Sequence, residues 1–331
     1  MKGRGPRGAW RSWALQIALV ALLLAGVAAL AAHALEVLRG RGIQSGFDFL
    51  LQPAGFEIGE GWLDFHAGQP FWRAFLAGLI NTLRAAVPAA AIALVLGTLL
   101  GIGRLAPHLL VRSICTWYVE ALRNVPLLVQ LLMLYFALTQ LLPDATEAVQ
   151  LLPGVWLSKS GLSLPWPVTA EGHWLPSSFE WPERTAFNIS GGAALTPEYL
   201  AIVFALGLYT AAFVAEIVRA GIQSVPAGQV DAARAMGFGP AQQLRIVVLP
   251  QALRLIVPAV TNQVLALVKN SSLAVAVGYP ELVSVANTSL NSTGRAFECI
   301  AVVMAVYLLL SLLIAGGTNL YNARVALRGW R

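Results

Sequence analysis

Long apolar blocks constrain the fold of this chain more than any other feature of its sequence. The chain has 331 residues, of which 57% are hydrophobic and only 11% are charged. An ordinary soluble domain carries about 25% charged residues. The apolar residues gather in blocks long enough to cross a hydrocarbon core roughly 30 Å thick, which takes about 20 helical residues. The sequence therefore predicts an all-α integral membrane protein with about six transmembrane helices.

The first predicted helix covers 13–38 and follows a basic segment at 1–12. A cleavable signal peptide is the alternative, because Ala32-His33-Ala34 fits a small-residue cleavage site. The apolar region of a signal peptide is usually about 7–15 residues long, and this one is clearly longer. We therefore expect the helix to be retained. The other apolar blocks lie roughly at Phe75–Gly103, Ile114–Leu142, Glu198–Arg219, from Leu253 onward, and Ala296–Asn319.

Two of these blocks contain residues that modify a plain helix. Gly97, Gly101 and Gly103 end the second block, and small residues let helices approach closely in a bilayer. The fifth block is expected to be interrupted by Pro258 and by the polar run Lys269–Ser272. The sequence thus predicts one closely packed helix and one broken helix.

The polar stretches 39–73 and 143–197 are predicted to be long extracytoplasmic loops. The second is rich in Pro, which cannot continue a helix, and in Trp, which favours the membrane–water interface, so we expect it to fold against the membrane surface. Basic residues gather at both termini and in the other connections, as is typical of cytoplasmic segments. Both termini, including the tail at 326–331, are therefore expected in the cytoplasm. The net charge is +6, but the charges form no single patch, and no nucleic-acid partner is predicted.

The stretch 220–250, between the fourth and fifth blocks, is predicted to be a pair of short cytoplasmic helices. Ser224 can cap the first helix, Pro226 suits its first turn, and Gly237 can end it where a positive φ costs little. Pro240 can start the second helix.

The first of these short helices carries a stripe of small apolar residues. Val230, Ala233 and Met236 recur at helical spacing, and such a stripe could dock into a groove on a partner. An amphipathic connector lying on the bilayer is the alternative. Pro250 marks the return of the chain into the membrane.

This stretch resembles the cytoplasmic loop of permease subunits of bacterial binding-protein-dependent ABC importers. The family pattern is Glu-Ala-Ala, three residues, Gly, nine residues, Ile, any residue, and Leu-Pro. The chain departs from it with Asp in place of Glu and Val247 in place of Ile. In that family the loop seats in the ATP-binding subunit, so we call 220–250 the coupling segment. The resemblance implies that ATPase coupling uses Asp231, Ala232, Ala233, Gly237, Leu249 and Pro250.

Three further stretches resemble polar amino-acid permeases of the histidine/glutamine type: Glu120 to Leu131, Lys269 to Leu273, and Asn81-Thr82-Leu83. The resemblance covers 74–325, with 143–197 as an insertion, and the first helix and overall length look like the branch that imports a broad range of L-amino acids. It implies a bacterial inner-membrane permease subunit of an ATP-driven L-amino-acid importer. The implied partners are an ATP-binding cassette ATPase, a second and related permease chain, a periplasmic amino-acid-binding protein, and membrane lipid.

Enzyme chemistry is not predicted for this chain. It contains no Gly-Lys pair, so the phosphate-binding loop that ends in Gly-Lys-Ser/Thr is missing, and ATP and Mg are expected on the partner ATPase. The four histidines are far apart and form no zinc pattern, so no cofactor or metal is expected in the chain itself.

Polar residues inside the apolar blocks are candidates for a substrate path, because such groups usually face a cavity or a partner. The alternative is that they fix helix packing; Glu120 and Arg123, three apart, can pair with each other. Glu216 and Arg219 are expected to brace the coupling segment. The candidate path residues are Glu120, Arg123, Asn124, Gln130, Asn262, Lys269, Asn270 and Ser271.

An ion-gradient-driven secondary amino-acid transporter is the alternative function. The interrupted fifth block with Lys269 is typical of such proteins. Against it stand the spacing of the coupling segment and the lack of a second half that repeats the first.

Overall fold

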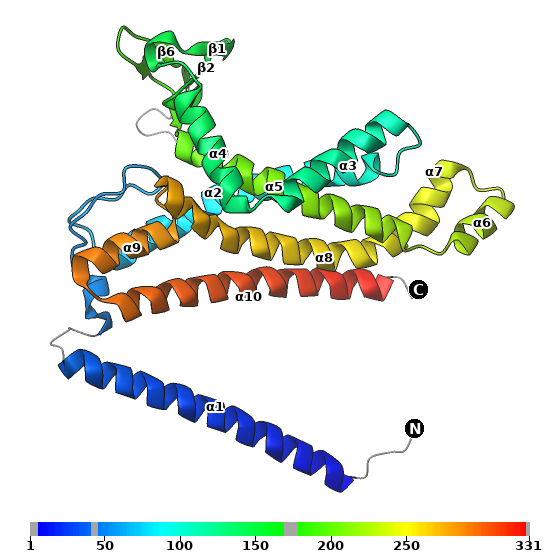
Figure 1. The fold of residues 1–331 in the computed structure, drawn as a ribbon, viewed down its shortest axis with the longest axis horizontal. Helices are drawn as coiled ribbons and strands as arrows, with labels where there is room; N and C mark the ends of the chain where they lie inside the picture. The colour runs from blue at the N-terminus through cyan, green and yellow to red at the C-terminus, as the bar shows by residue number, and fades with distance from the viewer. Residues whose placement is uncertain (1–5, 41–45, 169–177, 329–331) are drawn as a thin grey trace.

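The computed structural model describes residues 6–40, 46–168 and 178–328. Within them, five helices are long and apolar enough to cross a membrane, or six if one bent pair counts as a single span. The mostly helical fold therefore agrees with the prediction. The elements that supply these spans are α1 (Pro6–Gly40), α2 (Phe71–Gly103), α3 (Leu109–Asn124) with α4 (Leu127–Gln140), α5 (Pro197–Gln223), α8 (Leu249–Asn270) and α10 (Ala296–Arg328). Figure 1 shows α5, α8 and α10 running along one common direction, whereas α4 turns away from them.

Helices α2 and α5 form the closest helix pair. A Cβ added to Gly97 would lie 2.6 Å from Val214 Cβ, and one added to Gly101 would lie 2.7 Å from the Ala215 carbonyl oxygen. These contacts confirm that the glycines bring two helices together. A Cβ at Gly103 would instead meet Cys115 Sγ of α3.

The third apolar block is not one straight helix but a bent pair, α3 and α4, which together can count as one span. α3 and α4 are bent by 104°. The break lies at Val125-Pro126, because a residue before proline is restricted to extended backbone, and Val125 has φ −100° and ψ 130°. Gln130 Nε2 donates to the carbonyl oxygens of Leu122 and Val125 at 2.8 and 2.9 Å, so its amide bonds the backbone that the break frees.

The fifth block is interrupted at only one of the two expected places. α8 continues through Pro258, which neighbouring structure can tolerate in a transmembrane helix. The helix then ends at Asn270, and a 3-10 helix, η4 (Ser271–Val277), follows it. The hydroxyls of Ser271 and Ser272 donate to the carbonyl oxygens of Val268 and Lys269. The α-helix therefore gives way to a 3-10 helix at the polar run, although α8 and η4 remain parts of one continuous helical segment, Pro240–Val277, and α9 (Leu282–Thr293) follows.

The insertion at 143–197 contains short strands, which the sequence analysis did not predict. Four strands form an antiparallel sheet in the order β1-β2-β3-β8, with Leu157 opposite Leu162 and Ser163 opposite Ala194. Figure 1 shows the insertion beyond the end of α4, at the end of the molecule opposite α6 (Ala227–Ala235) and α7 (Pro240–Gln242). The strands are β1 (Val149–Leu152), β2 (Val155–Ser158), β3 (Gly161–Leu164), β4 (Trp166–Val168), β5 (Ser178–Glu180), β6 (Glu183–Arg184), β7 (Ile189–Ser190) and β8 (Ala193–Leu195).

Two short 3-10 helices precede larger elements of the described chain: η1 (Phe47–Leu51) precedes α2, and η2 (Ala145–Glu147) precedes the sheet. The buried core lies between α2, α4, α5, η4 and α8 at the end of the bundle near the insertion. A second buried cluster joins η1 and α2 to α9 and α10. Helix α1 stands apart from the bundle in Figure 1, and its apolar window is exposed along its length.

Candidate functional site

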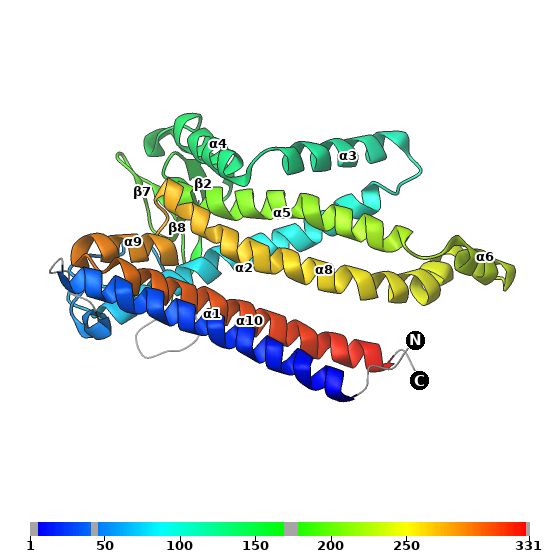
Figure 2. The same cartoon turned by 60° about the horizontal axis from the view of Figure 1, so that its bottom comes forward.

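The coupling segment forms an elbow beyond the ends of α5 and α8 (Figures 1 and 2). It consists of α6 (Ala227–Ala235), α7 (Pro240–Gln242) and a π-helix, η3 (Gln243–Val248), that runs directly into α8. Two short helices with a turn between them are therefore present, as predicted. Ser224 does not cap the first one: its hydroxyl donates to the Gly221 carbonyl oxygen and so belongs to the end of α5, and α6 begins after Pro226.

Gly237 ends α6 in the left-handed region, with φ +85°. Its N–H donates to Arg234 O at 3.0 Å, and the Phe238 N–H donates to Ala233 O at 3.1 Å. This pair of bonds satisfies the last carbonyls of the helix, and a glycine adopts the required φ without a Cβ penalty. The predicted helix end is confirmed.

Gln243 fixes the angle between α6 and η3. Its side chain is buried, and Nε2 donates to Phe238 O at 2.6 Å. The amide of Gln251, at the start of α8, donates to Gln229 Oε1 of α6 at 2.6 Å and to Val247 O at 2.9 Å. Side-chain amides therefore hold α6 against the first turns of α8.

The apolar stripe on α6 does not form one exposed face, which corrects that expectation. Ala233 is only 1% exposed and is buried within the elbow, whereas Met236 is 67% exposed. Ala233 must be small because α6 packs closely against η3. Of the other predicted coupling residues, Asp231, Ala232, Gly237, Leu249 and Pro250 are exposed. Asp231 lies 3.7 Å from Arg234 in an exposed ion pair.

The Leu249-Pro250 pair explains the π-helix. Proline has no N–H, and its ring would clash with the carbonyl four residues back in an α-helix. The Leu249 N–H instead donates to Leu244 O, five residues back, so the widened turn gives the ring room. The motif residues therefore set the shape of the elbow and expose the surface around Asp231 and Met236.

An ion cluster lies close to the elbow, where α2, α3 and α5 meet. Arg104 Nη1 lies 2.6 Å from Glu216 Oε2, and Arg104 Nη2 lies 3.5 Å from Glu120 Oε1. Glu216 also binds Arg219 on the same helix, and the role of these two residues in bracing the coupling segment stays a prediction. Glu120 therefore pairs with Arg104 instead of Arg123, and the Arg123 guanidinium lies 5.2 Å from the ring of Phe213.

The remaining candidate path residues lie in two groups. Asn124 and Gln130 are near the α3–α4 break, and both donate to backbone carbonyls, Asn124 to Glu120 O at 2.7 Å. Asn262 and Lys269 are exposed on α8, and Lys269 borders a hollow of about 560 Å³ against α9 and α10. Asn270 and Ser271 form the junction between α8 and η4. The structure thus gives three of these residues a visible packing role through bonds to backbone carbonyls, namely Asn124, Gln130 and Ser271.

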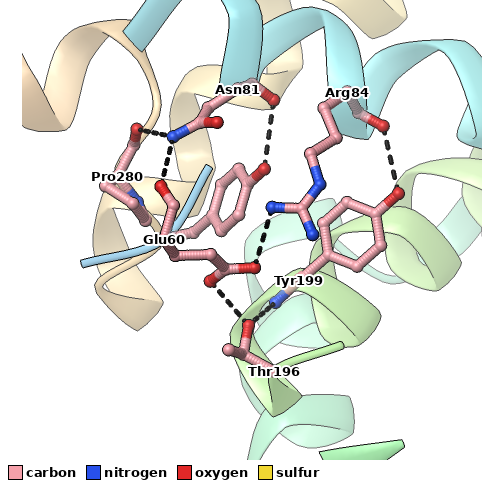
Figure 3. A network of polar contacts seen from close by, with 7 residues as sticks. Glu60, Asn81, Arg84, Thr196, Tyr199 and Pro280 are labelled. Atoms are coloured by element: carbon pink, nitrogen blue, oxygen red, sulfur yellow. Dashed lines mark hydrogen bonds and ion pairs between the residues drawn. The ribbon is translucent and has the colours of Figure 1, made fainter. Parts of the chain in front are cut away.

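A second polar network joins α2, α5, the η4–α9 turn and the segment before α2 (Figure 3). Arg84 Nη1 lies 3.2 Å from Glu60 Oε1, and the side chains of the two residues are 9% and 17% exposed. Glu60 Oε2 accepts from the Thr196 hydroxyl at 2.7 Å, and Thr196 caps the start of α5. The Tyr199 hydroxyl donates to Arg84 O at 3.1 Å, and the Arg84 guanidinium lies 4.6 Å from the ring of Tyr199.

Asn81 also belongs to this network. Its Nδ2 donates to Glu60 O at 2.8 Å and to Pro280 O at 3.0 Å. Burial raises the pKa of Glu60, and the bonds from Thr196 and Arg84 oppose that rise. The sequence analysis did not select Glu60 or Arg84. The signal that could have found Arg84 is an ionisable residue inside an apolar block, which usually has a functional or structural partner.

No group of three or more His, Cys, Asp or Glu that could hold a metal ion occurs among the described residues. The candidate site thus has two parts, which are the exposed elbow at one end of the bundle and the buried polar network toward the other.

Comparison with known proteins identifies the class of this chain. Residues 93–326 match the family of binding-protein-dependent transport system inner membrane components. The chain is 36% identical to the general L-amino acid transport system permease protein AapQ of Rhizobium johnstonii, over 96% of this chain and 93% of AapQ. It is 32% identical to the glutamate/glutamine/aspartate/asparagine transport system permease protein BztB of Rhodobacter capsulatus, over 96% and 94% of the two chains.

A solved structure agrees with these matches. A chain of an amino acid ABC transporter crystallised with histidines aligns with a TM-score of 0.57 and 27% identity, over 77% of this chain and 95% of that chain. The chain therefore belongs to the family of binding-protein-dependent transport system inner membrane components. It is a multi-pass transport subunit of the permease class, and the secondary-transporter alternative is rejected.

Proposed function

We propose that this chain is the permease subunit of an ATP-driven importer of L-amino acids in a bacterial inner membrane. The observation that carries the proposal is the elbow, whose helix end, buried Ala233 and π-turn arise from the residues that resemble the coupling motif. A separate ABC ATPase binds ATP and Mg, and its closure pushes on the exposed surface around Asp231 and Met236. The relatives AapQ, a general L-amino acid permease protein, and BztB, a glutamate/glutamine/aspartate/asparagine permease protein, support amino acids as the substrate class.

The proposal includes two further partners. A periplasmic amino-acid-binding protein delivers the substrate at the end that carries the insertion, and a second, related permease chain completes the path. Both termini lie in the cytoplasm together with the coupling segment, because their basic residues follow the positive-inside rule.

Purification and transport test this proposal together. The tagged chain is extracted gently from native membranes, and the copurifying polypeptides are identified. A stoichiometric partner with a Gly-Lys-Ser/Thr phosphate loop is expected. The complex is then placed in liposomes loaded with ATP and Mg, with the copurified or co-encoded binding protein outside, and uptake of each common amino acid is measured.

Uptake should require ATP hydrolysis, so replacing the phosphate-loop lysine of the partner should abolish it. Uptake by the chain without an ATPase, or uptake driven by an ion gradient alone, would contradict the proposal. A second permease chain among the partners would identify a heterodimer, and a second copy of this chain alone would contradict that part.

A further inference from the structure

Asn81 and Arg84 lie one turn apart on α2, and both side chains point toward Glu60 (Figure 3). Asn81 is 1% exposed, and the Arg84 side chain is 9% exposed. Residues three apart on a helix share a face, so the two side chains act on one region of space. That region is filled by the main chain and the carboxylate of Glu60.

The two side chains have bonding capacity that suits the two ends of a free amino acid. The Arg84 guanidinium is a planar fork that can bind a carboxylate through two parallel bonds, but it contacts Glu60 through Nη1 alone. Asn81 Oδ1 is buried and has no hydrogen-bond partner among the described residues. Buried polar atoms without a partner are uncommon, and an amide oxygen can accept from an ammonium group.

Glu60 reaches this place from an irregular segment whose ends are joined by a bridge between Pro53 and Pro70. No helix or strand of the described chain holds residues 52–70. A cavity of about 330 Å³ lies beside Glu60, and Pro280, which also binds Asn81, contributes to its wall. Withdrawal of Glu60 would therefore connect Asn81 and Arg84 to an existing cavity.

We propose that Asn81 and Arg84 form a binding site for the transported amino acid, which Glu60 occupies in the conformation described here. Arg84 takes the α-carboxylate, and Asn81 Oδ1 accepts from the α-ammonium group. Tyr199, 4.6 Å from the guanidinium, supports the charge of Arg84 while Glu60 and the substrate exchange. This inference rests on the proposed function, because it takes the substrate to be an amino acid.

Equilibrium dialysis tests the site on the complete transporter without its binding protein. The probe is the amino acid with the highest uptake in the screen described above, used as the free acid and as its carboxamide. Glu60→Gln keeps a hydrogen-bond acceptor for Thr196, but its uncharged amide binds the Arg84 guanidinium more weakly than the carboxylate does. It should tighten binding of the free acid on the order of ten-fold, because a larger fraction of the site is open.

Arg84→Gln should weaken binding of the free acid by about ten-fold or more, since a charge-assisted carboxylate pair is lost. That variant leaves Glu60 buried without its partner, so the double variant Glu60→Gln with Arg84→Gln supplies the decisive comparison. It removes both charges together and should bind the free acid and the carboxamide equally. Arg112→Gln, at an exposed position on α3, is the matched control and should bind as the unmodified transporter does.

Two outcomes would overturn the site. One is a double variant that binds the free acid as tightly as the unmodified transporter and still rejects the carboxamide, which would leave Glu60 and Arg84 a structural pair. The other is no binding to the Glu60→Gln transporter. Failure of the proposed function looks different, because the unmodified complex would then show no ATP-dependent uptake of any amino acid.

Discussion

Gly237 shows how one residue of the motif can act through backbone conformation alone. A Cβ built at this position meets nothing within 4 Å, while φ is +85°. A side chain there costs backbone strain and causes no clash within the chain. Asn tolerates the left-handed region, whereas a β-branched residue does not.

We therefore expect Gly237→Asn to keep most ATP-dependent uptake and Gly237→Val to lose it, with both chains inserted normally in the membrane. Uptake by the reconstituted complex is the measurement, and copurification of the ATPase shows whether docking is lost. Equal loss in both variants would mean that the partner contacts the surface at Gly237 directly.

Asp48 provides a pH-dependent bond between η1 and the start of α10. Arg295 Nη2 donates to Asp48 Oδ2 at 3.1 Å, and Arg295 Nη1 donates to Gly46 O at 2.7 Å. The hydrogen bond from Arg295 holds the pKa of Asp48 below its usual value of 3.8, with burial opposing it. A lowered folded-state pKa means that the stabilisation is fully present above the unfolded value and is lost as the pH falls through the folded one.

The unmodified chain in detergent should therefore be more stable than Asp48→Asn at neutral pH. The difference should shrink as the pH falls through the acidic range below 3.8, because Asp48 then becomes protonated. Thermal unfolding of both chains across this range is the measurement. A difference that stays constant down to the lowest pH would show that the carboxylate charge contributes nothing.

At the scale of elements, the α2–α5 contact depends on two glycines. A Cβ at Gly97 or Gly101 would lie within 2.8 Å of α5 atoms, including backbone carbonyl oxygens that cannot move alone. We expect Gly97→Ala and Gly101→Ala each to lower the stability of the chain by about 1–3 kcal/mol, the usual cost of overpacking.

Gly316→Ala is the matched control for these variants. Gly316 lies within α10, and a Cβ there meets nothing within 4 Å, so this change should not lower the thermal stability of the chain in detergent. Equal effects of all three changes would instead point to a general loss of helix flexibility.

Local sequence rules predicted some of these elements and not others. Gly237 and Pro240 determine helix ends through their own backbone chemistry, and Gly97 shows its packing role by size alone. Pro258 was expected to interrupt its block and does not, whereas Pro126, where no break was predicted, separates α3 from α4. The difference depends on neighbouring helices that satisfy or fail to satisfy the freed backbone groups, which no local pattern records.

Long-range polar partners were equally inaccessible to sequence reasoning. Glu60 contacts Thr196, and Arg104 contacts Glu216, across more than a hundred residues in each case. Spacing predicted that Glu120 pairs with Arg123 on the same helix, whereas Glu120 pairs with Arg104, just past the end of α2. The strands of the insertion are only two to four residues long, too short to show the regular alternation that predicts a half-buried strand.

At the scale of the whole molecule, the coupling segment and the insertion lie at opposite ends of the bundle (Figure 1). The start of α1 and the end of α10 lie toward the same end as the elbow (Figure 2). The proposed topology therefore places Met236 in the cytoplasm and Phe187 in the periplasm. These two side chains are 67% and 90% exposed, so both positions suit chemical labelling.

We expect a membrane-impermeant thiol reagent applied to intact cells that have a permeable outer membrane to label Phe187→Cys and not Met236→Cys. Cys115 and Cys299 are first replaced by Ala to remove the background. Disrupting the membrane should then expose Met236→Cys. The reverse pattern would invert the topology, and labelling of both positions in intact cells would place them on one side.

The π-helix η3 lies between α6 and α8, and it makes the orientation of α6 sensitive to the number of residues in the coupling segment. Each residue added to a continuous helix rotates everything beyond it by about 100° and shifts it by about 1.5 Å along the axis. An alanine inserted after Leu244 would keep every side chain of the motif, yet it would turn α6 to a different azimuth around α8. The number of residues between Asp231 and α8, as much as their identity, therefore determines how Asp231 is oriented toward the partner that it contacts. An insertion and a nearby compensating deletion should restore function together where neither does alone.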